Sequence, residues 1–201
     1  METPKQPYSI DDLSNSQEED GFFQKLGSSV TEFIETLVVF GAIFAIIFLF
    51  VAQPHKVSGN SMVPTLHNGD YILTEKLTYR FREPEREDII IFKNPQNESQ
   101  DFVKRILGIP GDRIKITDSS VYINSLRIKE GYLPNGLQTK DGDYLTQNTE
   151  VKIGEDQYFV MGDNRSHSLD SRDWGPVSFD KIIGKAFFRY WPLSAAGLLK
   201  D

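Results

Sequence analysis

The sequence predicts a mostly β domain of antiparallel strands that follows one apolar helix. Two observations indicate this fold class. From residue 53 onward, short runs rich in β-branched and aromatic residues alternate with turn residues, without a strand–helix–strand repeat. Before that point lies one uninterrupted apolar segment, residues 37–52, which has no polar face. A chain of 201 residues has room for one domain of ordinary size and an appended segment.

The composition excludes several classes of protein. The chain has no cysteine, so disulfides, thiolate metal sites and a cysteine nucleophile are all excluded. The net charge of −7 arises near the start, because residues 1–32 hold seven acids and two bases, and the remainder holds 22 acids and 20 bases. Neither part has the basic surface that nucleic acid requires, so no nucleic-acid partner is expected.

Two segments precede the β domain. Residues 1–32 are acidic and lack apolar periodicity, so we expect a disordered tail. Residues 33–52 are predicted to form a transmembrane anchor, because residues 33–36 extend the apolar run to the roughly 20 residues that a span needs. A cleaved signal peptide would have a basic start, and a core helix would have a polar face. The charges that flank the segment do not fix its orientation.

Residues 53–201 are expected to form the β-rich domain. Period-two alternation between turn residues predicts the following strands: Tyr71–Leu77, Asp88–Phe92, Phe102–Leu107, Arg113–Thr117, Val121–Ile123, Gln157–Met161 and Lys185–Tyr190. The region Lys129–Thr149 is rich in Gly, Asp and Asn, and we expect it to be a long loop.

A serine in a stiff turn is the first candidate for chemistry. Ser61 lies between Gly59, which allows a substrate to approach the backbone closely, and Pro64, which fixes the exit from the turn. Most serines in such turns only form the turn. Only residues further along the chain can therefore support the assignment of Ser61 as a nucleophile.

A lysine between apolar neighbours is the second candidate. Strand alternation places Phe102, Lys104 and Ile106 on one face and Arg105 on the other. A lysine on an edge strand ordinarily extends its amine into water. If Lys104 is buried instead, its pKa falls well below the usual value of about 10.4. The neutral amine could then accept a proton from a serine.

Residues 162–175 form the third candidate, a loop that combines acids, bases and hydroxyl groups. A calcium loop that starts at Asp163 would need glycine at its sixth position, where Ser168 stands. A triad of Ser61, His167 and Asp170 is an alternative to the serine–lysine pair, because histidine is the commonest general base. A non-enzymatic alternative is a membrane-tethered β domain that binds a partner through this loop.

Together these segments closely resemble the conserved boxes of type I signal peptidases, the membrane-bound Ser–Lys endopeptidases that cut signal peptides from exported preproteins. The family's serine box resembles residues 58–66, its lysine box residues 103–112 and its C-terminal box residues 162–175. Residues 68–73 are similar to a fourth, structural box. Boxes and intervening strands cover most of residues 53–191 in the family's order, which implies an antiparallel-sheet catalytic domain of the signal-peptidase type.

The resemblance implies a role for each matching residue. Ser61 matches the nucleophile, whose own backbone N–H helps to hold the oxyanion, and Lys104 matches the general base. Some members have a serine hydroxyl that completes the oxyanion hole, and this chain has Gly59 at that position. Ser58 or Asn60 would have to supply the second donor.

Five further residues match supporting positions: Ser168, Asp170, Arg172, Asp163 and Arg165. In the family, the hydroxyl at Ser168 holds the lysine amine in position. Asp170 and Arg172 match a partnered pair that shapes the site. The family's substrates carry small residues one and three positions before the cut, which implies shallow pockets beside Ser61.

The resemblance also implies partners and a location. The partners implied for this protein are preproteins that bear signal peptides, the lipid bilayer and, as a further candidate, the export translocon. No metal or organic cofactor is implied. The implied location is the plasma (inner) membrane, or alternatively a thylakoid membrane. The protein would cross it once, with its N-terminus in the cytoplasm and its catalytic domain on the export side.

Overall fold

The computed structural model describes residues 29, 31–46, 48 and 52–199, which fall into two compact units. The first unit is helical at residues 29 and 31–46, and its described side chains are exposed. Among the described residues, no helix is both long enough and apolar enough to cross a membrane, so the predicted transmembrane helix is not seen there. Residues 1–28 and 30 of the predicted tail lie outside the described residues, as do residues 47 and 49–51 of the predicted anchor.

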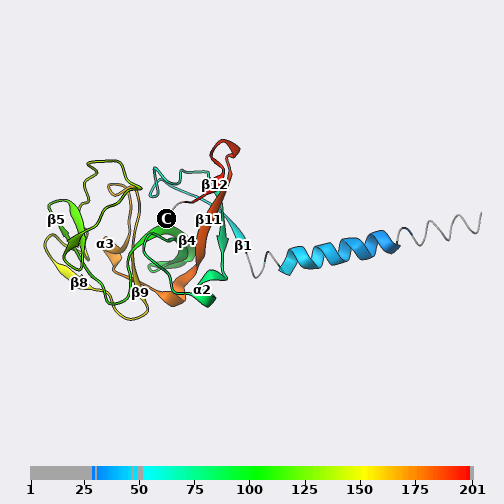
Figure 1. Cartoon of the computed structure of the whole chain (residues 1–201), viewed down its shortest axis with the longest axis horizontal. Helices are drawn as coiled ribbons and strands as arrows, with labels where there is room; N and C mark the ends of the chain where they lie inside the picture. Colours follow the sequence, from blue (N-terminus) through cyan, green and yellow to red (C-terminus); the bar gives the residue numbers. More distant parts are fainter. Residues whose placement is uncertain (1–28, 30, 47, 49–51, 200–201) are drawn as a thin grey trace, which may run out of the picture. The chain divides into compact units, whose positions relative to one another are not determined.

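The second unit, Phe48–Asp201, is mostly β, as the sequence predicts (Figure 1). Its elements in chain order are β1 (Ala52–Lys56), β2 (Tyr71–Glu75), α2 (Thr78–Phe81), β3 (Ile89–Asn94), β4 (Asn97–Gly108), β5 (Arg113–Thr117), β6 (Ser120–Ile123), β7 (Leu126–Arg127), β8 (Glu150–Lys152), β9 (Gln157–Met161), α3 (Ser171–Trp174), β10 (Val177–Ser178), η2 (Phe179–Lys181), β11 (Ile182–Trp191), η3 (Leu193–Ala195) and β12 (Gly197–Leu198).

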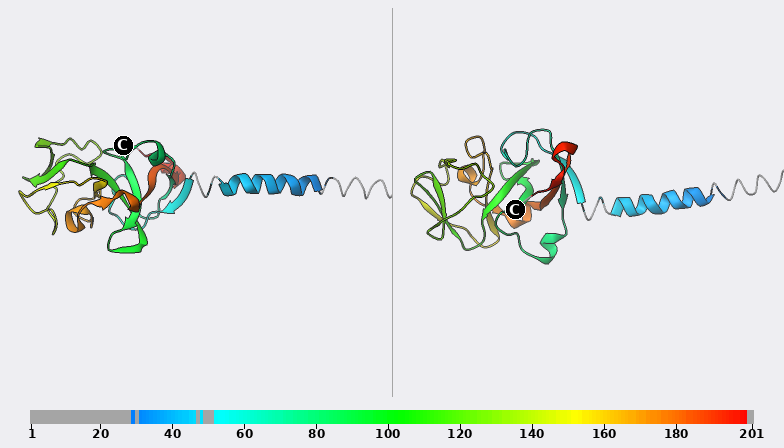
Figure 2. Two further views of the ribbon diagram at one scale, coloured as in Figure 1. Left: turned by 90° about the horizontal axis from the view of Figure 1, so that it is seen from below. Right: turned by 45° about the horizontal axis from the view of Figure 1, so that its top comes forward.

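The strands form two antiparallel sheets. The larger sheet has eight strands in the order β1-β2-β11-β3-β4-β9-β10, with β12 paired to β11. The smaller sheet has the order β7-β6-β5-β8, and it lies at the opposite end of the unit from β1 and β12 (Figures 1 and 2). Strand β9 pairs with β4 only from Arg105 onward, so within the described residues the first half of β4 is paired on one side only, by β3.

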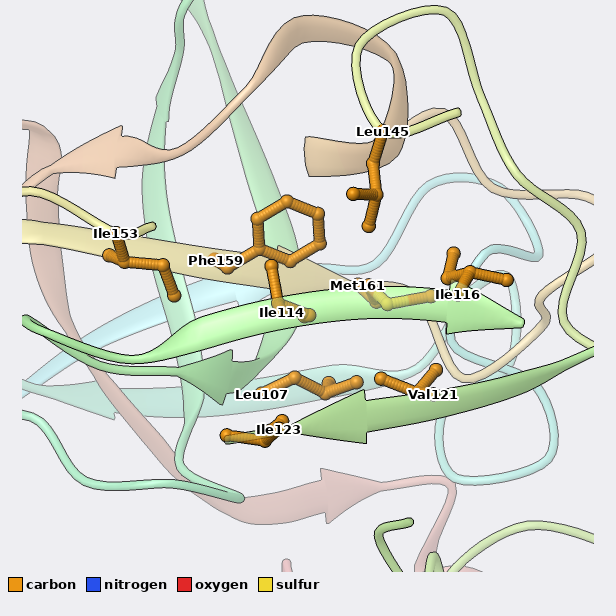
Figure 3. Packing of buried hydrophobic residues seen from close by; sticks show 9 residues of the cluster. All are labelled: Leu107, Ile114, Ile116, Val121, Ile123, Leu145, Ile153, Phe159 and Met161. Carbon is orange, nitrogen blue, oxygen red and sulfur yellow. The ribbon is translucent and has the colours of Figure 1, made fainter. Parts of the chain in front are cut away.

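Alternation along β3 explains how the larger sheet is buried on both faces. Ile89 and Ile91 join one apolar cluster with the residues that follow β1, whereas Ile90 and Phe92 join another cluster with β4 and β9. A third cluster joins the smaller sheet to β4 and β9 (Figure 3). It consists of Leu107, Ile114, Ile116, Val121, Ile123, Leu145, Ile153, Phe159 and Met161. The larger sheet therefore has a fixed, dry framework on which side chains can be positioned.

The predicted strand bounds agree best with the observed bounds where apolar and polar residues alternate strictly. Strands β5 and β9 have the predicted bounds. Strand β4 begins five residues before its predicted start at Phe102, because Asn97 and Asp101 also pair with β3, on either side of a register shift. The predicted long loop is confirmed, since residues 128–149 contain no helix or strand. The predicted anchor ends at Ala52, where the structure already has β1.

Candidate active site

The serine turn, residues 57–66, connects β1 to β2. Gly59 has a φ of +96°, which favours glycine, and its N–H donates to Asn68 Oδ1 at 2.9 Å. Beyond Ser61, the side chains of Met62 and Leu66 enter the core one helical turn apart, and the Leu66 N–H donates to the Met62 carbonyl at 2.8 Å. These contacts anchor the turn on both sides of Ser61, which is half-buried.

Lys104 of β4 reaches this turn from the middle of the sheet. Its Nζ donates a hydrogen bond to Ser61 Oγ at 2.7 Å. The lysine is only 4% exposed, and Nζ lies 5.3 Å from the centre of the Phe102 ring, so the predicted apolar face is confirmed. Burial lowers the pKa of Lys104 from 10.5 to about 8, although Asp170 and Asp163 act in the opposite direction. About a tenth of the amine is therefore neutral at pH 7 and able to accept a proton.

Asp170 and Arg172 form the ion pair that the resemblance implies. Arg172 Nε and Nη2 donate to the two carboxylate oxygens of Asp170 at 2.8 and 2.9 Å. The same carboxylate accepts the N–H of Gly162 at 3.0 Å, and together with Asp173 it forms a capping box at the start of α3. Because Asp170 is fully buried, these bonds hold the two ends of the 162–175 loop together.

Gly162 is the point at which this loop meets the serine turn. A Cβ at Gly162 would overlap the Ser61 carbonyl and the Ser168 side chain. The Asn164 N–H donates to the Ser61 carbonyl at 2.9 Å, and the Asn164 side-chain amide donates to the Asn60 carbonyl at 3.0 Å. Only glycine permits two backbone segments to pack this closely.

A second buried ion pair connects the loop to β4. Asp163 accepts hydrogen bonds from Arg105 Nε and Nη2, each at 3.0 Å, and from the Thr65 hydroxyl at 2.5 Å. Thr65 belongs to the serine turn, and Arg105 follows Lys104 in β4 while pointing to the opposite face. The Arg105–Asp163 pair therefore fixes the position of Ser61 relative to Lys104.

Arg165 joins the long loop 128–149 to the same assembly. Its guanidinium donates to Thr139 Oγ1 at 2.8 Å and to both carboxylate oxygens of Glu130. Its Nε also donates to the Gly162 carbonyl at 3.1 Å. Sequence reasoning missed Glu130 and Thr139, because no motif or periodicity distinguishes them from the other polar residues of an irregular loop.

Two loop residues differ from what their sequence patterns suggest. Ser168 Oγ is buried and has no hydrogen-bond partner in the part of the chain that the structure describes, so its role towards Lys104 stays a prediction. His167 is exposed, and its Nδ1 lies 2.9 Å from Ser166 Oγ. Since the Asp170 carboxylate is engaged by its arginine, the alternative Ser–His–Asp triad is not assembled.

The loop 162–175 also lacks the properties of a partner-binding surface. Its four charged residues singled out above are buried and paired: Asp163, Arg165, Asp170 and Arg172. A docking loop would present such charges to solvent, where a partner could reach them. The arrangement therefore does not favour the non-enzymatic alternative.

Ser61 and Lys104 lie in a cleft of about 590 Å³. Its lining includes residues 55–61, from β1 and the serine turn, and residues 100–104 of β4. Ser58 and Asn60, the candidates for a second oxyanion donor, are exposed in this cleft. Over the described residues, no group of three or more His, Asp or Glu side chains is arranged to hold a metal ion.

In this open cleft, a serine hydroxyl is hydrogen-bonded to a buried amine. This arrangement is typical of a serine hydrolase that uses lysine in place of histidine. Residues 30–191 match the family model "Signal peptidase, peptidase S26". The chain belongs to this family, whose members are membrane-associated, and it is a serine endopeptidase of the signal peptidase type.

Several relatives are similar over most of the chain. A "Probable signal peptidase I-2" of Synechocystis sp. is 40% identical over 158 residues, which cover 76% of this chain and 69% of that protein. "Signal peptidase IB" of Staphylococcus aureus is 34% identical over 177 residues, which cover 81% of this chain and 92% of that protein. A crystal structure of a signal peptidase I from Enterococcus faecalis is 30% identical, with a TM-score of 0.43, and covers 52% of this chain and 97% of that one.

Proposed function

We propose that this protein removes N-terminal signal peptides from exported preproteins at a membrane surface, with Ser61 as nucleophile and Lys104 as general base. One observation carries the assignment of the residues. Lys104 Nζ lies 2.7 Å from Ser61 Oγ, in a setting that lowers the lysine pKa to about 8. The relatives are named signal peptidases, which supports signal peptides as the substrate class.

The chemistry proceeds through an acyl-enzyme. Neutral Lys104 takes the proton from the Ser61 hydroxyl as Oγ attacks the scissile carbonyl carbon. The carbon–nitrogen bond then breaks, and the leaving amine takes the proton from the Lys104 ammonium. Water next attacks the ester, again giving its proton to Lys104, which returns a proton to Ser61 Oγ as the signal peptide leaves.

The surrounding residues keep this pair in position. The backbone N–H of Ser61 serves as one oxyanion donor, and Ser58 or Asn60 supplies the second, because Gly59 has no side chain. The Arg105–Asp163 pair holds the serine turn against β4. Asp170 and Arg172 hold the loop that carries Ser168, whose buried hydroxyl becomes available to the Lys104 ammonium once the Ser61 proton has been transferred.

The finer topology is also part of the proposal. Residues 33–52 anchor the protein by a single pass through the plasma membrane or, alternatively, a thylakoid membrane. Residues 1–32 form a cytoplasmic tail, and residues 53–201 work on the export side, close to the bilayer and the translocon. Protease added to the exported side of intact membranes should digest the chain beyond Lys56 and spare the acidic tail. Digestion of the tail alone would contradict this topology.

The catalytic assignment is tested by labelling the nucleophile. An acylating serine inhibitor should label the wild-type chain at Ser61 and stop preprotein cleavage in detergent. The Ser61→Ala variant should be neither labelled nor active, and its folding should be unchanged. Ser99→Ala, which removes an exposed hydroxyl from β4, is the matched control and should behave as wild type. Cleavage by Ser61→Ala above about one per cent of wild type would disprove the assignment.

A further inference from the structure

Asn164 bonds to the backbone carbonyl groups on both sides of the nucleophile. Its side-chain amide donates to the Asn60 carbonyl at 3.0 Å, and its backbone N–H donates to the Ser61 carbonyl at 2.9 Å. Asn164 is half-buried in the 162–175 loop and does not line the cleft, whereas Asn60 and Ser61 do. Two successive carbonyl groups of the serine turn therefore point towards the loop, outside the cleft.

The orientation of the Asn164 amide follows from its neighbours. The Asn60 carbonyl can only accept a hydrogen bond, so the amide nitrogen of Asn164 must face it. On the other side, the Ser166 hydroxyl donates to Asn164 Oδ1 at 3.3 Å. The Asn60 carbonyl also accepts the Val63 N–H, at the longer distance of 3.3 Å. Asn164 therefore makes the shorter of these two bonds to the carbonyl that precedes Ser61.

The Asn60 carbonyl and the Ser61 N–H belong to the same peptide unit. This unit is trans, so its carbonyl and its N–H point in opposite directions. Because the carbonyl is held against the loop, the N–H faces the other way, towards the cleft that both residues line. Within the part of the chain that the structure describes, the Ser61 N–H donates no hydrogen bond. It is therefore available to an oxyanion in the cleft.

The bond from Asn164 also strengthens the Ser61 N–H as a donor. Hydrogen bonds in a chain polarise one another, so an amide whose carbonyl accepts a hydrogen bond has a more polar N–H. A donor that is aimed in advance at the developing charge needs no reorganisation during the reaction. Asn164 can therefore influence the oxyanion through the peptide unit before Ser61, without touching the substrate.

We propose that Asn164 is a positioning residue for the oxyanion hole, which orients and polarises the peptide unit that carries the Ser61 N–H. This inference rests on the proposed role of Ser61 as nucleophile. Asn164→Leu has a similar shape and keeps the backbone N–H, but it loses the amide donor. Its kcat should fall about 10–100-fold, less than the loss of a complete oxyanion donor. Its KM should stay within about twofold, because the ground-state carbonyl carries little charge.

The experiment uses the full chain in detergent, a preprotein-derived peptide, and two ligands that share its sequence before the cut. In the peptide aldehyde, Ser61 Oγ adds to the carbonyl carbon, and the carbonyl oxygen then occupies the oxyanion position. The peptide alcohol cannot react and reports ground-state binding. Asn164→Leu should weaken the aldehyde by about the same factor as kcat, leave the alcohol affinity unchanged and keep the wild-type pH midpoint of kcat/KM. Asn135→Leu makes the same change in an exposed loop and should behave as wild type.

An unchanged kcat in folded Asn164→Leu overturns the inference. An equal loss of affinity for both ligands, or a shifted pH midpoint, also overturns it, because either would indicate a general loosening of the serine turn. Asn164→Asp turns a carboxylate oxygen towards the Asn60 carbonyl, and it should lower kcat at least as far. If neither variant folds, Asn164 is a structural residue and the inference is overturned. Cleavage by the wild type reports separately on the proposed function, and if the wild type does not cleave the peptide, both proposals fail.

Discussion

Two lysines flank the same isoleucine in the larger sheet, and their surroundings differ. Lys104 of β4 and Lys185 of β11 both pair in register with Ile90 of β3. Lys185 Nζ lies 2.6 Å from the buried carboxylate of Asp88, whereas Lys104 Nζ lies 2.7 Å from the neutral hydroxyl of Ser61. A carboxylate stabilises a charged amine, and a hydroxyl does so far less. The position in the sheet is shared, so the proposed role of Lys104 as a base depends on its burial and on the absence of a bonded carboxylate such as the one beside Lys185.

Replacing Lys104, the proposed base, should have the largest effect. Lys104→Met fills the same apolar space without an amine, and we expect preprotein cleavage to fall by about 10²–10⁴-fold with the fold intact. Lys104→Arg should fail as well, because a guanidinium does not deprotonate. Cleavage assays together with circular dichroism test both variants. An active Lys104→Arg enzyme would contradict the role of a neutral amine.

Removing the carboxylate beside the other lysine should affect stability instead. Asp88 is buried and accepts hydrogen bonds from Arg82, Lys185 and Tyr79. Asp88→Asn should lower the free energy of unfolding by about 3 kcal/mol, at the low end for a broken buried ion pair because the cations are partly exposed. Chemical denaturation measures the loss. The folded fraction should keep the wild-type pH dependence of cleavage, and a shifted profile would show that the two lysine sites are coupled.

The pH dependence of cleavage and of stability should reflect the protonation of the Lys104 amine. Because the pKa of Lys104 is lowered to about 8, kcat/KM should rise about tenfold per pH unit below that value and level off above it. The unfolded chain retains the lysine proton up to about pH 10.5. The unfolding free energy should therefore increase between these two values, by at most about 1.4 kcal/mol per unit. Lys104→Met should lack this increase, which excludes other titrating groups as its cause.

The smallest effect is expected at the exposed histidine of the loop. His167 bonds to Ser166 and not to Asp170, so His167→Asn should change kcat/KM by no more than a few fold, about 1 kcal/mol. A fully inactive but folded His167→Asn enzyme would restore the histidine alternative.

Alternation predicted those parts of the fold in which apolar residues face a core. Strands β5 and β9 were predicted to the residue, because every second side chain of β5 is buried and β9 is apolar after its first residue. Strand β1 was missed because it contains Pro54, which is unfavourable in a strand interior, and directly follows the apolar segment. The polar start of β4 was missed for a related reason, since its pairing to β3 leaves no pattern in residue type.

The residues of the candidate site also fall into two groups: those that a local motif predicts and those that only the structure reveals. Ser61 and Lys104 stand in recognisable motifs, and the structure brings their side chains together. Glu130, which pairs with Arg165, lies 35 residues away in an irregular loop. Such contacts arise from long-range packing, which one sequence does not encode in any local spacing.

Strand β4 places two cationic residues next to each other in sequence and on opposite faces. Lys104 is able to give up its proton, and Arg105 keeps its charge under all conditions in which proteins fold. A slip of one residue in the pairing of β4 with β3 would exchange the two faces. The permanently charged guanidinium would then face Ser61, and the amine would meet Asp163. A chain folded in that register would contain every residue of the site and have no base, so fidelity of strand pairing during folding is itself a requirement for proteolysis.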